Sequence, residues 1–294
     1  MQNFLNHPAL KQRLEALYHI KNKTMNYTHF KVEIENKIAQ VAFNRPEKAN
    51  ALNMDAWTEM QSVFETLSMS DRVRVIILSG EGKHFCSGID LELLMSIGGL
   101  TDISCSGKRS EKIRELILTL QRTITAIEKC SKPVLAAIHS GCIGGGVDIA
   151  TACDMRYCSD DAYFTIKEID LGMVADIGTL QRLPKIISPG MAAEMVYTGR
   201  KIYGPEAQSI GLVNYSYTSK ETLMESVKQI AETIAGKSPV SIRGTKEILR
   251  YTRDHTVDDA LNYMSTWNAA MLLSNDLKEA FMATMEKRQP LFED

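Results

Sequence analysis

The chain has 294 residues, of which 34 are Lys or Arg and 36 are Asp or Glu, so its formal net charge is −2. Apolar residues make up 44% and charged residues 24%, proportions that exclude a disordered, collagen-like or disulfide-dense chain. The balanced charge gives no basic footprint for nucleic acid. Apolar runs such as residues 73–78, which include Arg74, are far too short to cross a bilayer. Composition therefore predicts a soluble, enzyme-sized protein with neither a nucleic-acid nor a membrane partner.

The cysteines and the chain ends bear on the compartment. Six cysteines occur without a C-x-x-C pair, so we expect reduced thiols, no disulfide framework and no metal site. Residues 1–28 are expected to be an N-terminal extension, which lacks a signal peptide's apolar stretch but leaves an organellar presequence open. The last residues, Leu291-Phe292-Glu293-Asp294, are not a peroxisomal tripeptide. We expect a cytoplasmic location, with a mitochondrial one open if the source is eukaryotic.

The first part of the chain alternates strand and helix patterns. Apolar and polar residues alternate over residues 30–43 around Glu35-Asn36-Lys37, which predicts a β-hairpin. The pattern then predicts an amphipathic helix over 54–67, a buried strand over 73–78 and a long helix over 108–129.

The same alternation continues beyond residue 130. The predicted elements are, in order, a strand over 133–138, a glycine-rich turn over 141–146, a helix over 147–152, strands over 155–158 and 163–166, and a helix over 179–186. Short strands that alternate with helices predict parallel β/α units. From about residue 189 the pattern is helical, apart from a strand over 212–217. The expected layout is an α/β core over residues 29–210 and a helical C-terminal region over residues 211–294.

Two glycine turns each follow a buried strand and precede a helical stretch. One is Gly141-Cys142-Ile143-Gly144-Gly145-Gly146, and the other is His84-Phe85-Cys86-Ser87-Gly88-Ile89-Asp90. Such turns leave backbone N–H groups unpaired, and glycine lets a ligand approach them closely. Neither turn fits the usual nucleotide loops, and either one alone can be a tight structural turn. Together they can direct two N–H groups at one oxyanion, where each donor is worth ~3 kcal/mol.

Three segments resemble the sequence blocks of the crotonase (enoyl-CoA hydratase/isomerase) superfamily in order and spacing. The segments are Asn44-Arg45-Pro46-Glu47-Lys48-Ala49-Asn50-Ala51-Leu52, Phe85-Cys86-Ser87-Gly88-Ile89-Asp90 and Gly144-Gly145-Gly146-Val147-Asp148. The resemblance runs from about residue 30 to the C-terminus. It implies an α/β spiral of repeated ββα units, a helical C-terminal trimerisation region, and a homotrimer or a homohexamer made of two trimers.

The resemblance also implies a ligand and residues that bind it. The ligand is an acyl-coenzyme A thioester, in which coenzyme A belongs to the substrate, so no separate cofactor is expected. The N–H groups of Ile89 and Gly145 would form an oxyanion hole. The implied substrate-binding residues are Ser87, Gly88, Ile89, Asp90, Leu91, Gly146 and Lys287. Lys287 would meet a coenzyme A phosphate, across a subunit boundary if need be, although a solvated helix end also accounts for it.

Acidic residues concentrate in one stretch of the chain. Residues 148–176 contain seven acids and two basic residues, a net charge of −5. Asp148, Glu168 and Asp176 are the catalytic candidates there. Each has a structural alternative: Asp148 can meet a helix dipole, Glu168 can be exposed, and Asp176 can cap the next helix.

The resemblance favours a proton-handling role for these three acids. Hydratases of the superfamily have glutamates at the places of Asp148 and Glu168, and they often have a loop glycine at the place of Asp176. The combination here resembles the Δ3,5-Δ2,4-dienoyl-CoA isomerases of this superfamily. It implies conversion of 3,5-dienoyl-CoA to 2,4-dienoyl-CoA in fatty acid β-oxidation. Because C2 and C6 are four bonds apart, our hypothesis is that Glu168 is the base at C2 and Asp176 the acid at C6. Asp148 would hold charge or position Glu168.

Three other functions stay open at this point. A 2-enoyl-CoA hydratase is the nearest, although it needs two matched glutamates around a water. A 3-enoyl-CoA isomerase, which moves a single double bond, is the second. The third is a non-catalytic scaffold or RNA-binding protein, against which the three acids and the lack of basic surplus both count.

Overall fold

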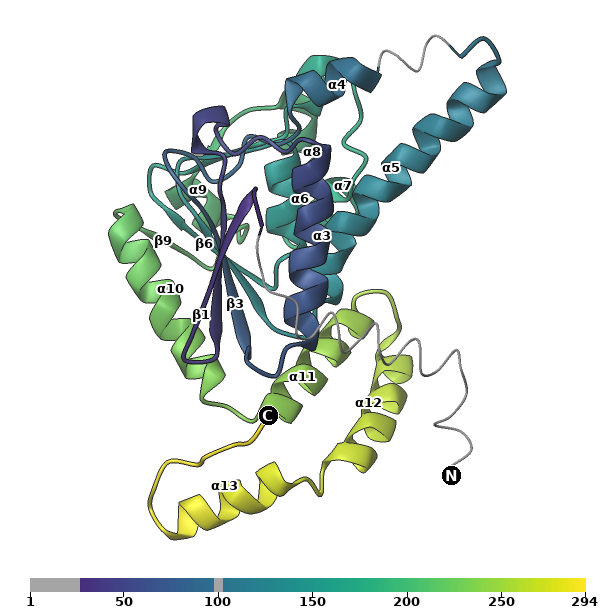
Figure 1. The fold of residues 1–294 in the computed structure, drawn as a ribbon. Coiled ribbons are helices and arrows are strands. Elements are labelled where there is room, and N and C mark those ends of the chain that lie inside the picture. The colour runs from purple at the N-terminus through teal and green to yellow at the C-terminus, as the bar shows by residue number, and fades with distance from the viewer. Residues whose placement is uncertain (1–26, 98–102) are drawn as a thin grey trace.

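A six-stranded sheet runs through the α/β part of the molecule (Figure 1). The computed structural model describes residues 27–97 and 103–294, so nearly all of the extension expected over residues 1–28 lies outside the described residues. The sheet has the order β1-β2-β3-β4-β6-β9. Its strands are β1 Phe30–Glu35, β2 Ile38–Phe43, β3 Val75–Gly80, β4 Val134–Ile138, β6 Met155–Ser159 and β9 Tyr215–Tyr217.

The pairing of these strands confirms the predicted hairpin and the predicted parallel units. β1 and β2 are antiparallel with Glu35 opposite Ile38, and the turn between them uses positive φ at Asn36 and Lys37. The remaining neighbours, from β2 to β9, are all parallel. The third strand begins two residues later than predicted, because Val75 and not Val73 pairs with Ile38.

A smaller sheet stands beside the large one and completes the repeating unit. It consists of β5 (Gly141–Ile143), β7 (Tyr163–Thr165) and β8 (Ile202–Tyr203). A large-sheet strand is followed by a small-sheet strand in β4–β5 and again in β6–β7. Cys86 forms a parallel bridge with Cys142, so the segment after β3 takes an equivalent place. This arrangement confirms the expected α/β fold with ββα units.

Helices occupy both faces of the large sheet and the C-terminal end of the chain. The helices are α3 Met54–Met69, α4 Leu91–Ile97, α5 Ser106–Lys129, α6 Gly145–Ala152, α7 Thr179–Arg182, α8 Pro189–Thr198, α9 Gly204–Ser209, α10 Lys220–Ala235, α11 Pro239–Thr252, α12 Val257–Met271 and α13 Asn275–Met285. Short 3-10 turns are η1 Pro46–Lys48, η3 Glu168–Leu171 and η4 Leu183–Lys185. No helix in residues 27–97 and 103–294 is long and apolar enough to span a bilayer.

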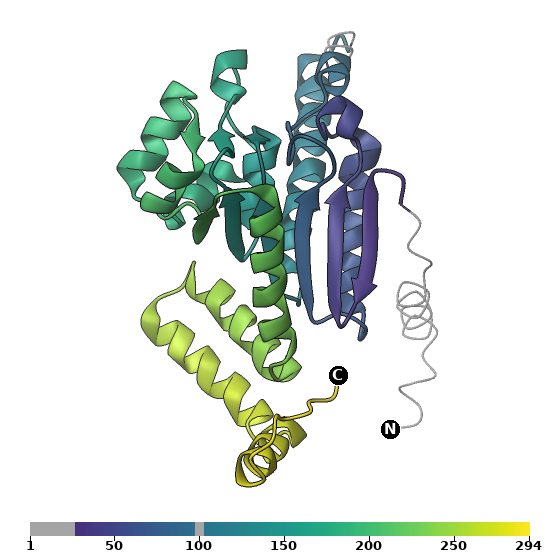
Figure 2. The ribbon, with the colours of Figure 1, turned by 90° about the vertical axis from the view of Figure 1, so that its left-hand side faces the viewer.

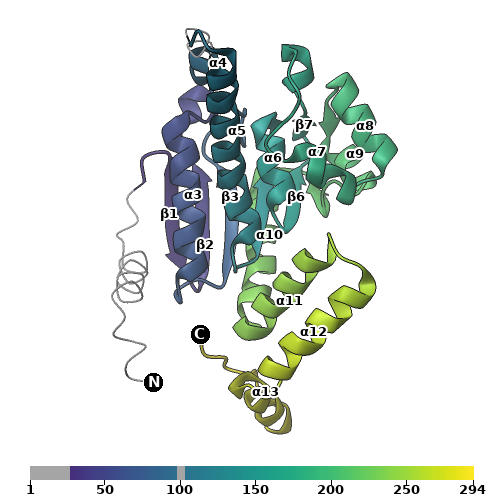
Figure 3. The same cartoon turned by 90° about the vertical axis from the view of Figure 1, so that its right-hand side faces the viewer.

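The two faces of the large sheet bury separate sets of side chains. α3, α5 and α6 cover one face (Figure 3), and α10 covers the other (Figure 2). Successive strand residues point to opposite faces. Accordingly Ile76 of β3 packs in the core on the α3–α5 side, whereas Ile77 packs with Leu223 and Val227 of α10. These two sets of buried side chains hold the strands in place, and the glycine turns follow directly after the strands.

The large sheet continues past the expected end of the core at residue 210. β9 pairs with β6, and α10 packs on β2, β3, β4, β6 and β9. The expected boundary between residues 210 and 211 therefore lies within the α/β layer, because β9 has its hydrogen-bond partners there. The three helices after α10 extend beyond this layer (Figure 3). Lys246 of α11 ties them to it, donating hydrogen bonds to Asp154 Oδ2 at 2.7 Å and to Lys132 O at 2.8 Å.

The acidic stretch differs locally from the predicted elements. Glu168 does not end a strand but begins the 3-10 turn η3, after β7 has ended at Thr165. The helix predicted over 179–186 divides into α7 and η4, and Pro184 lies in η4. A proline has no N–H to donate and cannot continue the α-helical ladder.

Candidate active site

The two glycine turns lie directly against each other. A Cβ atom on Gly88 would fall 2.7 Å from the Ile143 oxygen and 2.9 Å from the Gly145 nitrogen. A Cβ atom on Gly145 would fall 3.4 Å from the Gly88 Cα and 3.3 Å from the buried ring of Trp57. Gly88 also has a φ of 85°, a value that favours glycine. Glycine is therefore needed for the approach of the two backbones.

The contact between the turns leaves two backbone donors free. Leu52 N–H donates to Gly88 O at 2.8 Å, and Asp90 N–H donates to Leu52 O at 3.0 Å. Ile89 lies between these two bonded residues, so its own N–H points away from Leu52. Gly145 is the first residue of α6, where an N–H has no intrahelical acceptor. Neither N–H donates a hydrogen bond within the described part of the chain.

A cavity of about 650 Å³ opens beside the two turns. The predicted site residues in its wall are Ser87, Ile89, Asp90, Leu91, Gly145 and Glu168. Its wall also contains residues that the sequence analysis did not single out, among them Lys48, Ala51, Lys167, Asp170 and Met173. The signal for Lys48 and Ala51 was their place in the first of the three sequence blocks. Lys167 and Met173 flank η3 on a bend that the periodicity does not show.

Polar side chains of the first sequence block hold the second block in place. Asn50 Nδ2 donates to Glu81 O at 2.9 Å and to His84 O at 2.8 Å. Arg45 forms an ion pair with Asp90 at 3.0 Å. Burial alone would raise the pKa of Asp90, but the Glu92 N–H and Arg45 outweigh it and lower the pKa. The Asp90 carboxylate is thus occupied at the start of α4.

Asp148 is fully buried in α6 and is held by the next helix. Its Oδ1 accepts a hydrogen bond from Thr179 N–H of α7 at 2.6 Å, while its Oδ2 has no partner. Burial raises the pKa of Asp148 to about 7. The Thr179 hydrogen bonds act in the opposite direction, and the charge of Glu168 adds to the rise. Asp148 does not line the cavity but lies behind its wall.

Glu168 places its carboxylate against the second glycine turn. A Cβ atom on Gly144 would fall 3.1 Å from Glu168 Oε1, and Glu168 Oε2 is buried without a partner. Burial raises the pKa of Glu168, and the nearby charge of Asp176 raises it further. A carboxyl group with a free, buried oxygen at a cavity wall is a candidate for proton transfer.

Asp176 lies in the loop before α7. The residue as a whole is exposed, yet its carboxyl group has enough protein around it that desolvation raises its pKa. Its backbone oxygen accepts a hydrogen bond from Gln121 of α5 at 2.6 Å. Asp176 does not cap α7, since the N-cap is Gly178 and the first N–H of the helix, that of Thr179, donates to Asp148 Oδ1 instead. The charge of Asp176 acts on Glu168, but Asp176 does not line the cavity.

Three residues predicted to bind substrate do not line the cavity. Gly88 packs against the backbone of Ile143 and Gly145. Gly146 packs against the first turn, where a Cβ atom would fall 2.6 Å from Cys86 O, and it does not line the cavity. Lys287 follows α13, at the end of the molecule opposite α4 (Figure 1). This chain alone does not bring Lys287 to its own cavity, so the predicted contact requires a second copy.

The buried Asp148 predicts a pH dependence of stability. Its folded pKa lies above the ordinary value of 3.8, so the folded chain binds the proton more tightly and loses stability as the pH rises toward about 7. Asn at this position keeps an oxygen for Thr179 N–H but carries no charge. We expect the free energy of unfolding of wild type, relative to Asp148→Asn, to fall by roughly 3 kcal/mol between about pH 5 and pH 8.

Urea titrations of both proteins across this pH range measure the effect. Asp161→Asn is the matched control, because Asp161 is an exposed acid of the same stretch and its removal should leave the pH dependence unchanged. Parallel curves for wild type and Asp148→Asn would contradict the buried, proton-binding state of Asp148.

Comparison with known proteins agrees with this geometry. The profile of the enoyl-CoA hydratase/isomerase family matches residues 33–294. The chain is 50% identical over 259 residues to "Delta(3,5)-Delta(2,4)-dienoyl-CoA isomerase, peroxisomal" of Arabidopsis thaliana, which covers 88% of this chain and 93% of that one. It is 44% identical over 270 residues to the mitochondrial protein of that name from Mus musculus, covering 90% and 81%.

A solved structure shares the fold. The crystal structure of an enoyl-CoA hydratase from Bacillus anthracis superposes with a TM-score of 0.82 at 28% identity, over 90% of this chain and 99% of that one. The match extends across the α/β layer and the C-terminal helices. The chain belongs to the enoyl-CoA hydratase/isomerase family.

Proposed function

We propose that this chain is a Δ3,5-Δ2,4-dienoyl-CoA isomerase of fatty acid β-oxidation. The observation that carries the proposal is a series of three neighbouring carboxyl groups, Asp148, Glu168 and Asp176, of which Glu168 lies against the glycine turn that contains Gly145. Glu168 interacts electrostatically with both of the other acids. The names of the two relatives support the same reaction.

The reaction explains why more than one acid is useful. Conversion of a 3,5-diene to a 2,4-diene removes a proton from C2 and adds one at C6, with no change in oxidation state. These carbons are four bonds apart, so a single carboxylate is poorly placed to serve both. Glu168, at the cavity wall, takes the C2 proton, and Asp176 delivers a proton to C6.

The two glycine turns stabilise the intermediate. When the C2 proton leaves, the electron pair of the C–H bond moves through the conjugated system onto the thioester oxygen. The N–H groups of Ile89 and Gly145 donate to that oxygen, and each such donor is typically worth ~3 kcal/mol. The segment from Ser87 to Leu91 then lies beside the coenzyme A chain, along the cavity that these residues line.

The raised pKa values support the division of roles. Acid–base work near neutral pH needs one carboxyl group protonated while another is ionised. Burial raises the pKa of Asp148, Glu168 and Asp176 alike, and like charges add to the rise for the first two. The protons are therefore shared within one coupled cluster. Asp148, behind the cavity wall, influences the protonation of Glu168 through its charge.

The test of the function compares two substrates of equal chain length on one preparation. With 3,5-dienoyl-CoA we expect an increase in ultraviolet absorbance, because the product diene is conjugated with the thioester. With 2-enoyl-CoA we expect little loss of the enoyl absorbance, since hydration needs two matched glutamates around a water. Faster hydration than isomerisation would assign the chain as a hydratase. Turnover of a 3-enoyl-CoA alone would assign it as a single-bond isomerase.

The role of Asp176 predicts a large loss of rate on its removal. Asp176→Asn cannot donate a carboxyl proton, so we expect the isomerisation rate to fall by roughly 10²- to 10⁴-fold, the usual range for general acid catalysis. Stopped-flow absorbance at saturating 3,5-dienoyl-CoA measures the change. Asp161→Asn again serves as the control and should keep the wild-type rate. An Asp176→Asn rate within a few-fold of wild type would remove Asp176 from the mechanism.

We propose further that the chain assembles as a homotrimer, or as a hexamer of two trimers, through its C-terminal helices. Large apolar side chains on and between α12 and α13 are exposed, namely Val257, Leu261, Met264, Met271, Leu272, Leu273, Phe281, Met282 and Met285. A contiguous set of this kind typically marks a surface that another protein covers. Assembly through this region would also give Lys287 a route to the cavity of a neighbouring copy.

A charge placed among the exposed apolar side chains of these helices should break the assembly. We expect light scattering after size exclusion to give three or six times the chain mass for wild type and a smaller species for Phe281→Asp. Phe281 is 65% exposed in the single chain, so the change costs little unless another copy covers it. Thr284→Asp adds the same charge at an exposed residue of α13 and should keep the wild-type mass if apolar contacts decide. A monomeric wild type would overturn the proposal.

A further inference from the structure

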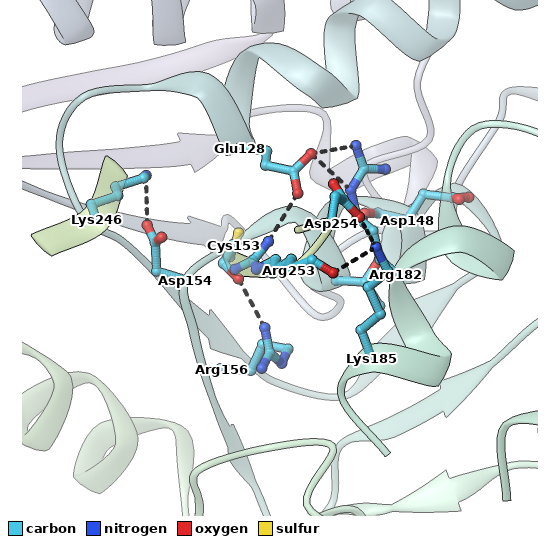
Figure 4. Close-up of polar contacts among 11 residues, drawn as sticks. Glu128, Asp148, Cys153, Asp154, Arg156, Arg182, Lys185, Lys246, Arg253 and Asp254 are labelled. Atoms are coloured by element: carbon cyan, nitrogen blue, oxygen red, sulfur yellow. Dashed lines mark hydrogen bonds and ion pairs between the residues drawn. The ribbon is translucent and has the colours of Figure 1, made fainter. Parts of the chain in front are cut away.

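A second cavity lies on the far side of Asp148, away from the glycine turns. It has a volume of about 790 Å³ and is lined by polar and charged side chains of α5, α6, α7 and the end of α11. Figure 4 shows the charged residues around it, with Asp148 close to Arg182. The charged residues that line this cavity do not include Asp148, Glu168 or Asp176. The ion pair between Arg182 and Glu128 fixes α7, the helix whose Thr179 N–H donates to Asp148.

Arg182 folds back over the start of its own helix. A Cβ atom on Gly178 would fall only 1.8 Å from Arg182 Nη1, so the guanidinium lies on the backbone of Gly178. Gly178 has a φ of 135°, which residues with a side chain rarely adopt. Gly178 and Arg182 therefore fit each other at the first turn of α7.

Glu128 of α5 fixes the position of this guanidinium. Its Oε2 accepts hydrogen bonds from Arg182 Nη2 at 2.9 Å and from Arg182 Nε at 3.3 Å. Its Oε1 accepts a hydrogen bond from Arg253 Nη1 at 2.9 Å. The side chains of Arg182 and Glu128 are only 14% and 21% exposed, so solvent screens their pair little. Glu128 thus binds two arginines, of which only Arg182 lies on Gly178.

The residue after Gly178 is the one that holds Asp148. Thr179 N–H donates to Asp148 Oδ1 at 2.6 Å, and Oδ2 of this carboxylate has no hydrogen-bond partner. A shift of the first turn of α7 would therefore move Asp148, which interacts with Glu168 at the cavity wall.

We propose that Arg182, anchored by Glu128, is a positioning residue for the isomerisation. It fixes the first turn of α7, so that Thr179 N–H holds the Asp148 carboxylate, and it places a positive charge near that carboxylate. The proposal rests on the proposed function of the Asp148–Glu168–Asp176 cluster. It adds to that function a pair of residues that touch neither the cavity wall nor the substrate.

The charges that face Asp148 determine the direction of the expected effects. Glu168 raises the pKa of Asp148 and Arg182 lowers it, while Cys142 on β5 is a buried, neutral thiol. Removal of the Arg182 charge should raise the pKa of the coupled cluster. Removal of the Glu128 charge leaves the positive charge of Arg182 without its negative partner, which should lower the pKa of the cluster. A purely structural role would not move the pKa in opposite directions.

The test measures kcat and kcat/KM for 3,5-dienoyl-CoA as a function of pH in three variants. For Arg182→Gln we expect kcat to fall roughly tenfold or more, with the acid limb of kcat/KM moved to higher pH. For Glu128→Gln we expect kcat to fall and the limb to move to lower pH. Arg253→Gln removes the other partner of Glu128, away from Gly178, and should keep the wild-type limb.

Several outcomes decide the matter. The proposal would be overturned if the acid limbs of kcat/KM for Arg182→Gln and Glu128→Gln stayed at the wild-type pH. It would also be overturned if both limbs moved in the same direction. If Arg182→Gln does not fold, Glu128→Gln alone decides by the direction of its limb. Arg182→Lys keeps the charge but not the two donors to Glu128, so its limb should return toward wild type while kcat stays reduced. A wild type without dienoyl isomerisation would overturn the proposed function instead, and the pH dependence of unfolding of Arg182→Gln would then still test the effect on Asp148.

Discussion

The approach of two glycine turns is the constraint on which the rest of the site depends. Gly88 and Gly145 can meet because Gly88 has no side chain: a Cβ atom on Gly88 would overlap the Ile143 and Gly145 backbone, whereas one on Gly145 would only be tightly packed. This contact brings together two peptide N–H groups that come from separate ββα units. The large sheet, the small sheet and the buried Trp57 ring all serve to hold these two backbones at that distance. The cavity, the Glu168 carboxylate beside Gly144 and the start of α6 all adjoin this contact.

Burial of acidic groups opposes stability and supplies reactivity. An ionised carboxylate is costly away from water, so Asp148 binds a proton more tightly than a solvated acid does. One short hydrogen bond from Thr179 and the charge of Arg182 offset part of this cost. The remaining cost of ionising Asp148 is not offset, whereas the partly buried Asp154 is paired with Lys246. An active site commonly departs in this way from the packing rules that the rest of the fold obeys.

The features that the sequence predicted well are those written in local patterns. The hairpin, α3, α5 and the two glycine turns depend on periodicity and on glycine, and the structure confirms them. The place of β9 in the large sheet depends on pairing with β6 across many residues, which no local pattern records. The family resemblance placed Gly146 at the substrate, but the contact of Gly146 with Cys86 O, on a segment far away in the sequence, leaves no such room. Arg182 carried no signal, since its importance arises from Glu128 on a distant helix.

The position of the first acid bears on the choice between the proposed isomerisation and hydration. Asp148 is one methylene shorter than the glutamate found at this place in hydratases, and it reaches Thr179 N–H behind the cavity wall. Among the three acids only Glu168 then faces the cavity, so two carboxylates do not converge on one water. Asp176 adds an acid farther along, where a hydratase often has glycine. In the proposed reaction, the same scaffold and the same pair of N–H donors would serve proton transfer at two carbons in place of hydration. Arg182 and Glu128 fix the position of α7, and that position decides whether the Asp148 carboxylate stays behind the cavity wall, bonded to Thr179 N–H.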